Sequence, residues 1–287
     1  VNSILASSGS WSILSDIEKS IKAKIEAVGT PLKDWDVHIN YGIKTGCNDA
    51  FIVDSVKRNE ILNNCITEEE RQKTAEIIRP ILRGRDVCRY GYEWANLWII
   101  NTHNGIKGDL ERIRIEDYPA IKQHLDKYWD KIEPRADQGD TAYNLRNCAY
   151  LDEFSKPKII YPNMTKFLPF VYDRSGVMTN QKCFIITGTH LEYLTAFFNS
   201  SLFKFCFADR FPELQGKTRE LSKIFMDEIS ILKINDTDEC MINKLVQDIQ
   251  MEYSVNKAKR IDKFIFDLYH LSIEEQMYIG FIDYGEK

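Results

Sequence analysis

The sequence of 287 residues lacks the short motifs by which several classes of enzyme are recognised. It has no Pro-Pro pair, so the Asn/Asp-Pro-Pro-aromatic motif of amino-methyltransferases is absent. No Phe-x-Gly-x-Gly or Gly-x-Gly-x-x-Gly loop is present to hold S-adenosylmethionine or a dinucleotide. No Asp/Glu-x-Lys triplet occurs, which removes the usual signature of a metal-dependent nuclease. These absences predict a chain that has no catalytic centre of its own.

Patterns for metal binding, export and membrane insertion are also missing. The five histidines show neither His-Glu-x-x-His spacing nor proximity in sequence to cysteines, so we expect no zinc site. The seven cysteines are scattered and never form Cys-x-x-Cys, which is typical of a reduced, cytoplasmic protein. We find no signal peptide and no apolar run of about 18 residues, and therefore expect no membrane contact. The first residue is Val1, which is compatible with a fragment of a longer polypeptide.

The net charge of −5 argues against a simple nucleic-acid binder, for which a basic domain is the first expectation. The charge is unevenly distributed, however, because residues 227–287 carry 13 acidic and 7 basic side chains. Within the remainder, residues 79–89 carry four arginines against Asp86, and residues 156–182 carry five cations against Asp173. Local basic patches therefore leave DNA binding open, although each patch taken alone also fits an ordinary solvated surface.

A short polar segment between Gly42 and Gly46 is the strongest local feature. Glycines permit positive φ and a close approach of the backbone to another molecule. Lys44, Thr45 and the nearby Asn48 supply a cation, a hydroxyl and an amide, all of which can reach a phosphate or a base edge. This glycine loop (residues 42–48) is therefore a candidate DNA contact, with an ordinary turn between two strands as the alternative.

Further candidate contacts are basic side chains in predicted turns. Arg83 and Arg85 flank Gly84, and guanidinium groups suit bidentate contact with phosphate or guanine. Pairing of either arginine with Asp86 is an equally good interpretation. The loop over residues 133–147 can also touch a nucleic-acid backbone, as many loops can, through Arg135, Tyr143 and Arg146. The secondary candidates for DNA binding are Lys166, Lys182, Lys217 and Arg219.

Hydrophobic periodicity predicts a mixed α+β chain with short strands, flanking helices and a helical C-terminal part. The predicted helices cover residues 12–28, 55–65, 67–80, 118–132, 190–208 and most of 227–287. The predicted strands cover residues 37–41, 51–54, 97–101, 158–161, 169–172 and 183–187. Ser12 or Ser15 caps the first helix, Pro80 ends the third, and residues 173–176 form the turn between the last two strands. Residues 199–201 interrupt the helix over 190–208 as a kink or a polar patch.

Several segments together resemble a known family. They are Gly-Ile-Lys-Thr-Gly-x-Asn-x-Ala-Phe at 42–51 and the segments 78–90, 98–100, 118–125, 144–146, 156–161, 199–200, 219–220 and 261–275. In this order they resemble the TaqI-like C-terminal specificity domain. That domain is the target-recognition part of adenine-specific DNA methyltransferases and fused restriction-modification enzymes. The resemblance extends over nearly the whole chain.

The resemblance implies that this chain recognises a sequence in double-stranded DNA and is not catalytic in isolation. It implies a methyltransferase domain, and in some relatives a nuclease domain, N-terminal to this region in the same or an associated polypeptide. S-adenosylmethionine and Mg would be needed only there, so we expect no cofactor in this chain. Residues 1–35 would then connect to the missing domain, 36–226 would form the recognition domain, and 227–287 a helical subdomain. The expected DNA contacts are the glycine-loop residues, the two arginines of the turn, and the secondary candidates.

Two other classes of function remain open. One is a protein-interaction module that acts through the acidic C-terminal helices. The other is an enzyme whose site is assembled from scattered residues, such as Asp86, His103 and Asp140. Salt separates DNA binding from a helix-groove contact, because DNA binding releases counterions and weakens steeply as salt rises.

Overall fold

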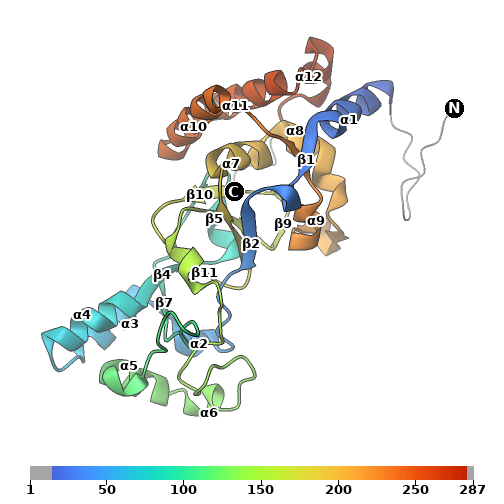
Figure 1. Ribbon diagram of the computed structural model, residues 1–287. Coiled ribbons are helices and arrows are strands. Elements are labelled where there is room, and N and C mark those ends of the chain that lie inside the picture. The colour runs from blue at the N-terminus through green and yellow to red at the C-terminus, as the bar shows by residue number, and fades with distance from the viewer. Residues whose placement is uncertain (1–14, 283–287) are drawn as a thin grey trace.

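The two most apolar predicted strands form the middle of a four-stranded antiparallel sheet in the computed structural model, which describes residues 15–282 (Figure 1). The sheet has the order β10-β8-β12-β2. Its strands are β2 (Val37–Tyr41), β8 (Lys158–Pro162), β10 (Val171–Asp173) and β12 (Cys183–Gly188). All five residues of β8 and the first five of β12 are buried, which explains their unbroken apolar runs.

Alternate residues of these strands enter two different hydrophobic cores, because successive side chains of a strand point to opposite faces. Tyr161 and Phe184 stack with ring centroids 5.3 Å apart and belong to the first core. Ile160 and Ile185 belong to the second core. The central sheet is therefore covered on both faces.

Helices from the N-terminal segment and from the C-terminal third of the chain form the first core together with this face of the sheet (Figure 1). They are α1 (Asp16–Val28), α7 (Leu191–Asn199), α8 (Ser201–Phe207), α10 (Asp236–Met251), α11 (Val255–Leu268) and α12 (Ile273–Ile279). Ser15 caps α1 through a capping box, as predicted, whereas Ser12 lies outside the described residues. A short sheet of β1 (Gly29–Pro31) and β15 (Ser230–Leu232) brings the N-terminal segment against the C-terminal region.

A buried carboxylate fastens α12 to α1. Glu275 accepts hydrogen bonds from Lys24 Nζ at 2.6 Å, Ser20 Oγ at 2.8 Å and the Ser272 amide at 2.6 Å. Burial opposes ionisation of Glu275, but these bonds outweigh it and lower its pKa to about 2. The two terminal regions of the chain are thus joined by a charged contact as well as by the shared core.

The second core lies between the central sheet and a smaller mixed sheet of order β11-β4-β7-β3. Its strands are β3 (Ile52–Asp54), β4 (Ile78–Leu82), β7 (Leu97–Ile100) and β11 (Met178–Thr179). Its helices are α2 (Asn48–Phe51), α3 (Ser55–Asn63), α4 (Glu68–Ile77), α5 (Pro119–Asp126) and α6 (Trp129–Ile132). Thr67 caps α4, and the Glu70 carboxylate accepts from the Ala120 amide at 3.0 Å, which joins α4 to α5.

Shorter elements complete the fold. They are β5 (Val87–Cys88), β6 (Gly91–Tyr92), β9 (Met164–Thr165), β13 (Glu213–Leu214), β14 (Thr218–Glu220) and α9 (Lys223–Asp227). Single 3-10 turns are η1 (Leu32–Asp34), η2 (Gly84–Asp86), η3 (Ile115–Asp117), η4 (Leu151–Ser155), η5 (Ala208–Arg210) and η6 (Gln215–Lys217). The α+β fold class is as predicted. Within residues 15–282, no helix combines the length and the apolar character that a membrane span requires.

The prediction that a helix continues to Pro80 is wrong. Helix α4 ends at Ile77, and Pro80 lies inside β4, opposite Trp98 of β7. The missing N–H of Pro80 leaves no gap in the sheet, because β11 pairs with β4 only from Ile81 onward. A strand tolerates proline where no neighbouring strand needs its N–H. The sequence alone does not reveal that Pro80 has such a position.

Two connections follow paths that the sequence does not predict. The strands that flank the glycine loop belong to different sheets, because β2 is in the central sheet and β3 is in the smaller one. Residues 173–176 do not join paired neighbours either, since the chain crosses to the smaller sheet as β11 before it returns as β12. Local turn signals give the position of a turn but not the partner of the strand that follows.

The predicted interruption at residues 199–201 is a break between α7 and α8. Asn199 is fully buried, and its side chain accepts from the Phe170 amide at 3.1 Å and donates to the Phe170 carbonyl at 2.7 Å. Ser200 caps α8. The polar residues in this apolar helix therefore tie it to the segment that leads into β10.

Candidate nucleic-acid interface

The predicted DNA contacts come from five segments that meet at one end of the central sheet. At this end, Tyr41 of β2 lies opposite Phe184, and Pro162 of β8 lies opposite Cys183. The chain continues from β2 into the glycine loop and from β8 into β9, while Lys182 immediately precedes β12. We call this region the loop end of the central sheet; in Figure 1 it lies where β2 passes down toward α2.

The Arg-Gly-Arg turn packs directly against the loop end. A Cβ added to Gly84 would lie 2.8 Å from the Lys182 carbonyl oxygen, so the two backbones are in contact. Asn163 donates its amide to the same carbonyl at 2.8 Å. Strand β9 follows at once and pairs with β14, where Arg219 lies opposite Thr165. Segments far apart in sequence are therefore held together by backbone contacts.

The glycine loop is fixed to the sheets at its start. The Gly42 amide donates to the Cys183 carbonyl at 2.9 Å, and the Ile43 amide donates to the Thr179 carbonyl at 2.7 Å. A Cβ on Gly42 would lie 2.0 Å from the Asn180 carbonyl oxygen, so this close approach requires glycine. The loop consequently starts from a rigid position.

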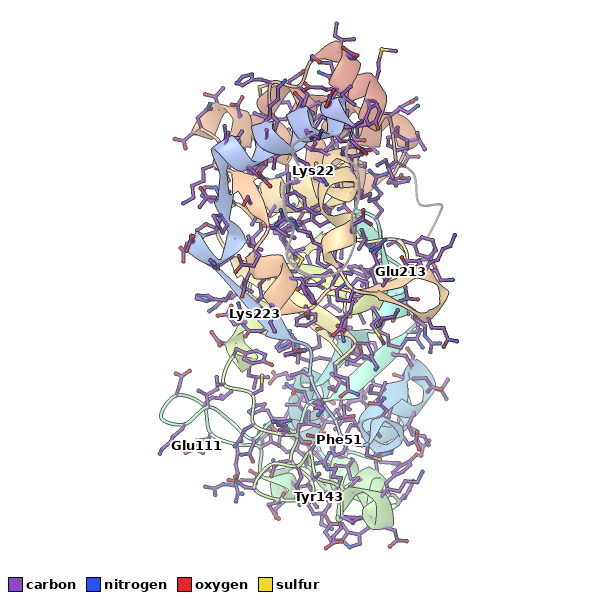
Figure 2. All side chains as sticks on the ribbon, turned by 90° about the vertical axis from the view of Figure 1, so that its right-hand side faces the viewer. Lys22, Phe51, Glu111, Tyr143, Glu213 and Lys223 are labelled. Atoms are coloured by element: carbon purple, nitrogen blue, oxygen red, sulfur yellow. The ribbon has the colours of Figure 1, made fainter. Side chains whose placement is uncertain are left out.

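A buried arginine joins the glycine loop to the loop over residues 133–147. The guanidinium of Arg135 donates to the carbonyl oxygens of Thr45, Ala142 and Asn144, and it lies 4.3 Å from the centroid of the Phe51 ring. Figure 2 shows Phe51 in the part of the molecule that holds the second core. Burial lowers the pKa of Arg135 to about 10, so the side chain is still charged at neutral pH.

Two polar residues of the glycine loop are used inside it. Thr45 is 2% exposed, and its hydroxyl donates to Asn48 Oδ1 at 2.7 Å. A buried hydroxyl cannot reach a phosphate, so the structure gives Thr45 a role in shaping the loop. The rest of the Asn48 side chain is exposed.

Lys44 is exposed and shares a carboxylate with a second cation. Its Nζ lies 3.2 Å from Asp137 Oδ2, while Arg146 Nη1 lies 3.1 Å from Asp137 Oδ1. The two cations come from the glycine loop and from the loop over residues 133–147, which Arg135 holds together. The sequence offers Arg135, Tyr143 and Arg146 as candidate contacts in this loop. No sequence signal distinguishes the exposed Arg146 from the buried Arg135.

The two arginines of the turn have different environments. Arg83 Nη2 lies 2.7 Å from Asp86 Oδ1, Arg83 Nε donates to Asp86 Oδ2 at 3.0 Å, and Asp86 is 4% exposed. Hydrogen bonding to Asp86 raises the pKa of Arg83. The structural interpretation therefore applies to Arg83, whereas Arg85 points to solvent.

The secondary candidates likewise divide into exposed side chains and one that is held by neighbouring residues. Lys166, Lys182 and Lys217 are exposed, and none of them forms an ion pair with another residue in the described range 15–282. Arg219 is largely covered: it donates to the Phe211 carbonyl at 3.1 Å and lies near Asp209 and Glu213, at 3.2 and 3.4 Å. Figure 2 shows the segment with Glu213 and the loop with Glu111 on opposite sides of the molecule.

The residues proposed for a scattered catalytic site serve other contacts. Asp86 binds Arg83, and Asp140 Oδ2 lies 3.4 Å from Arg112. The His103 ring accepts from the Gly105 amide at 3.2 Å, and burial lowers the pKa of His103. Over the described part of the chain, no group of three or more His, Cys, Asp or Glu side chains is arranged to hold a metal ion.

An apolar groove of about 590 Å³ lies between α10 and α11, in the acidic C-terminal region. Its apolar lining residues are Met241, Leu245 and Phe264, and its other lining residues are Lys244, Lys259, Arg260, Lys263 and Asp267. The surface that these helices present at the groove is therefore basic and apolar, although residues 227–287 as a whole are acidic.

The described residues thus form an α+β fold in which two hydrophobic cores share one central sheet. Residues 79–231, more than half of the chain, match the model of the TaqI-like C-terminal specificity domain. The chain belongs to this family, as its ordered motifs predict.

Two solved structures with a similar fold are a restriction endonuclease and a restriction-modification enzyme. The type IIG restriction endonuclease BpuSI matches with a TM-score of 0.54 and 13% identity, over 88% of this chain and 33% of that one. The type IIL restriction-modification enzyme MmeI, in complex with DNA, matches with a TM-score of 0.61 and 11% identity, over 87% of this chain and 35% of that one. This chain thus spans about a third of the length of either structure.

Proposed function

We propose that this chain recognises a specific sequence in double-stranded DNA as the specificity domain of a restriction-modification enzyme. The family match over residues 79–231 is the observation that carries the proposal. The structure of the similar enzyme MmeI is a complex with DNA, which supports the same interpretation.

The loop end of the central sheet supplies the DNA-facing surface in this proposal. Its exposed cations, Lys44, Arg85, Lys166, Lys182 and Lys217, fix the register of the protein on backbone phosphates. Side chains of neighbouring loops then read base edges, chiefly in the major groove, where each base pair has a distinct pattern of donors and acceptors. The net charge of −5 does not oppose this arrangement, because much of the acidic excess lies in residues 227–287.

The chemistry itself would belong to other domains. A methyltransferase domain, with or without a nuclease domain, would lie N-terminal to this chain in the same polypeptide. S-adenosylmethionine and Mg would be bound there, and this chain would need no cofactor. Its grip on DNA would present an adenine that the methyltransferase flips out of the stack. Such an enzyme acts in the cytoplasm.

Salt-dependent titration of duplex DNA tests the proposal. We expect binding of random-sequence duplex to weaken steeply as salt rises. The slope of log binding constant against log salt concentration should become shallower by roughly 0.9 for each phosphate contact removed. The variant with Arg85→Ala and Lys182→Ala should bind more weakly and less salt-sensitively. The control variant with Lys244→Ala and Arg260→Ala removes the same two charges from the distant α10 and α11 and should change binding little. If neither this chain nor the full-length polypeptide that contains it binds duplex DNA at low salt, the proposal is wrong.

A protein-interaction role is the second candidate, and the groove between α10 and α11 favours it. The mainly apolar lining of the groove is suited to an amphipathic helix rather than to a DNA backbone. Such binding would depend on Leu245 and Phe264 and would persist at salt concentrations that abolish DNA binding. Replacing both residues by serine should leave DNA binding intact if the two surfaces are separate.

A further inference from the structure

We propose that Lys44 and Arg146 form a binding site for one backbone phosphate of duplex DNA, and that Asp137 occupies this site as an intramolecular competitor. The inference rests on the proposed function and adds to it a specific anion site and a means of regulating its strength. Asp137 would limit the affinity of the domain for DNA, so that tight binding requires further contacts.

The geometry of the carboxylate carries this inference. Asp137 presents one oxygen to each cation, with Oδ2 at 3.2 Å from Lys44 Nζ and Oδ1 at 3.1 Å from Arg146 Nη1. Two non-bridging phosphate oxygens on one phosphorus atom resemble two carboxylate oxygens on one carbon, and both groups accept charge-assisted hydrogen bonds from Lys and Arg. A phosphate can therefore replace the carboxylate between the same two cations.

The accessibility of the three side chains is compatible with such an exchange. The side chains of Lys44 and Arg146 are 48% and 57% exposed, whereas that of Asp137 is 25% exposed. Both cations can thus be reached from solvent while they still contact the carboxylate. Exposed ion pairs of this kind contribute little to stability, so an incoming phosphate does not have to break a strong contact.

The backbone beneath the site is rigid. Arg135 binds the Thr45 carbonyl of the glycine loop and two carbonyls of the loop over residues 133–147, and it is 7% exposed. A Cβ on Gly46 would lie 3.0 Å from Asp137 Cβ, so the two loops are in direct contact. Exchange of carboxylate for phosphate therefore needs only movements of side-chain ends, and the cations are already held close together.

The test compares two substitutions that make the same change in net charge. Asp137→Asn removes the competitor, whereas Asp130→Asn removes an exposed acid of α6 that forms no ion pair with another residue between 15 and 282. Random-sequence duplex DNA is titrated at several salt concentrations. We expect Asp137→Asn to bind roughly five- to tenfold more tightly at low salt, with a salt slope steeper by about one, because freed cations release additional counterions from DNA. Asp130→Asn should change affinity by less than about twofold.

A second comparison isolates the site itself. Lys44→Ala should weaken binding more in the Asp137→Asn background than in the wild-type background, because Asp137 already neutralises Lys44 in the wild type. The same should hold for Arg146→Ala. Thermal unfolding of each variant establishes that the fold is retained.

The outcomes separate this inference from the proposed function. If Asp137→Asn binds no more tightly than Asp130→Asn, or if Lys44→Ala has the same effect in both backgrounds, the competitor model is wrong while DNA recognition stands. If no variant binds duplex DNA, in this chain or in the full-length polypeptide, the proposed function itself fails.

Discussion

Arg135 is the residue whose replacement tests the architecture of the candidate interface most directly. Its guanidinium donates to three carbonyl oxygens and leaves only its Nε without a partner among the described residues. A hydrogen bond from a charged donor contributes about 1.5–3 kcal/mol, and contributions within one network do not add fully. Burial of the charge offsets part of this gain, so we expect Arg135→Met to lower the free energy of unfolding by about 2–4 kcal/mol.

Urea unfolding measures the total effect, and amide hydrogen exchange locates it. The loss should be accompanied by faster exchange in the glycine loop and at Leu145, whose amide donates to the Thr102 carbonyl at 2.9 Å. Arg146→Met is the matched control, since Arg146 belongs to the same loop but is exposed and should cost less than about 0.5 kcal/mol. Equal stability of the two variants would refute the view that Arg135 joins the loops.

Three further predictions concern charged groups away from that contact. Glu275→Gln should lower the free energy of unfolding, measured in urea, by about 2 kcal/mol at neutral pH. The pKa of Glu275 is lower in the folded state than in the unfolded state, so the difference between wild type and variant should vanish as the pH falls from 4.5 toward 2. Lys158→Met should cost about 3–5 kcal/mol in urea unfolding, because it leaves the buried Asp173 without its partner at 2.6 Å. Arg83→Ala should lower the melting temperature, because Arg83 binds the buried Asp86. Arg85→Ala should leave the melting temperature unchanged and reduce only the affinity for DNA, because Arg85 is exposed.

The sequence predicted elements whose signal is local and periodic. The strand at 183–187 agrees closely with β12 because an apolar run of that length has few alternatives in a buried sheet. The strand at 37–41 agrees with β2, in which apolar and polar residues alternate. The first helix was predicted as well, with Ser12 and Ser15 as alternative caps, and the structure shows Ser15 in a capping box with Glu18. Sheet order was not, because pairing depends on contacts between distant segments.

The sequence predicted which segments form the candidate site. It did not predict which side chains of those segments are exposed. A motif places Thr45 and Arg83 next to residues that can contact DNA, yet both are held by neighbours inside their own turns. Arg135 has no motif, because its importance lies in carbonyl groups of loops that are distant in sequence. Burial of a polar side chain is a tertiary property, and composition reveals only that such a group exists.

The two-sided burial of the central sheet connects stability to recognition. Each of its middle strands contributes to both cores, so the position of the loop end is supported by packing on both faces of the sheet. Loops held on such a scaffold can exchange exposed residues at little cost, since surface substitutions usually change stability by less than about 0.5 kcal/mol. Gly42 is different, because a Cβ there would meet the Asn180 carbonyl at 2.0 Å. Variation in DNA specificity should therefore concentrate at exposed loop positions that are not needed for phosphate contact, such as Asn48, while Gly42 and Arg135 stay fixed.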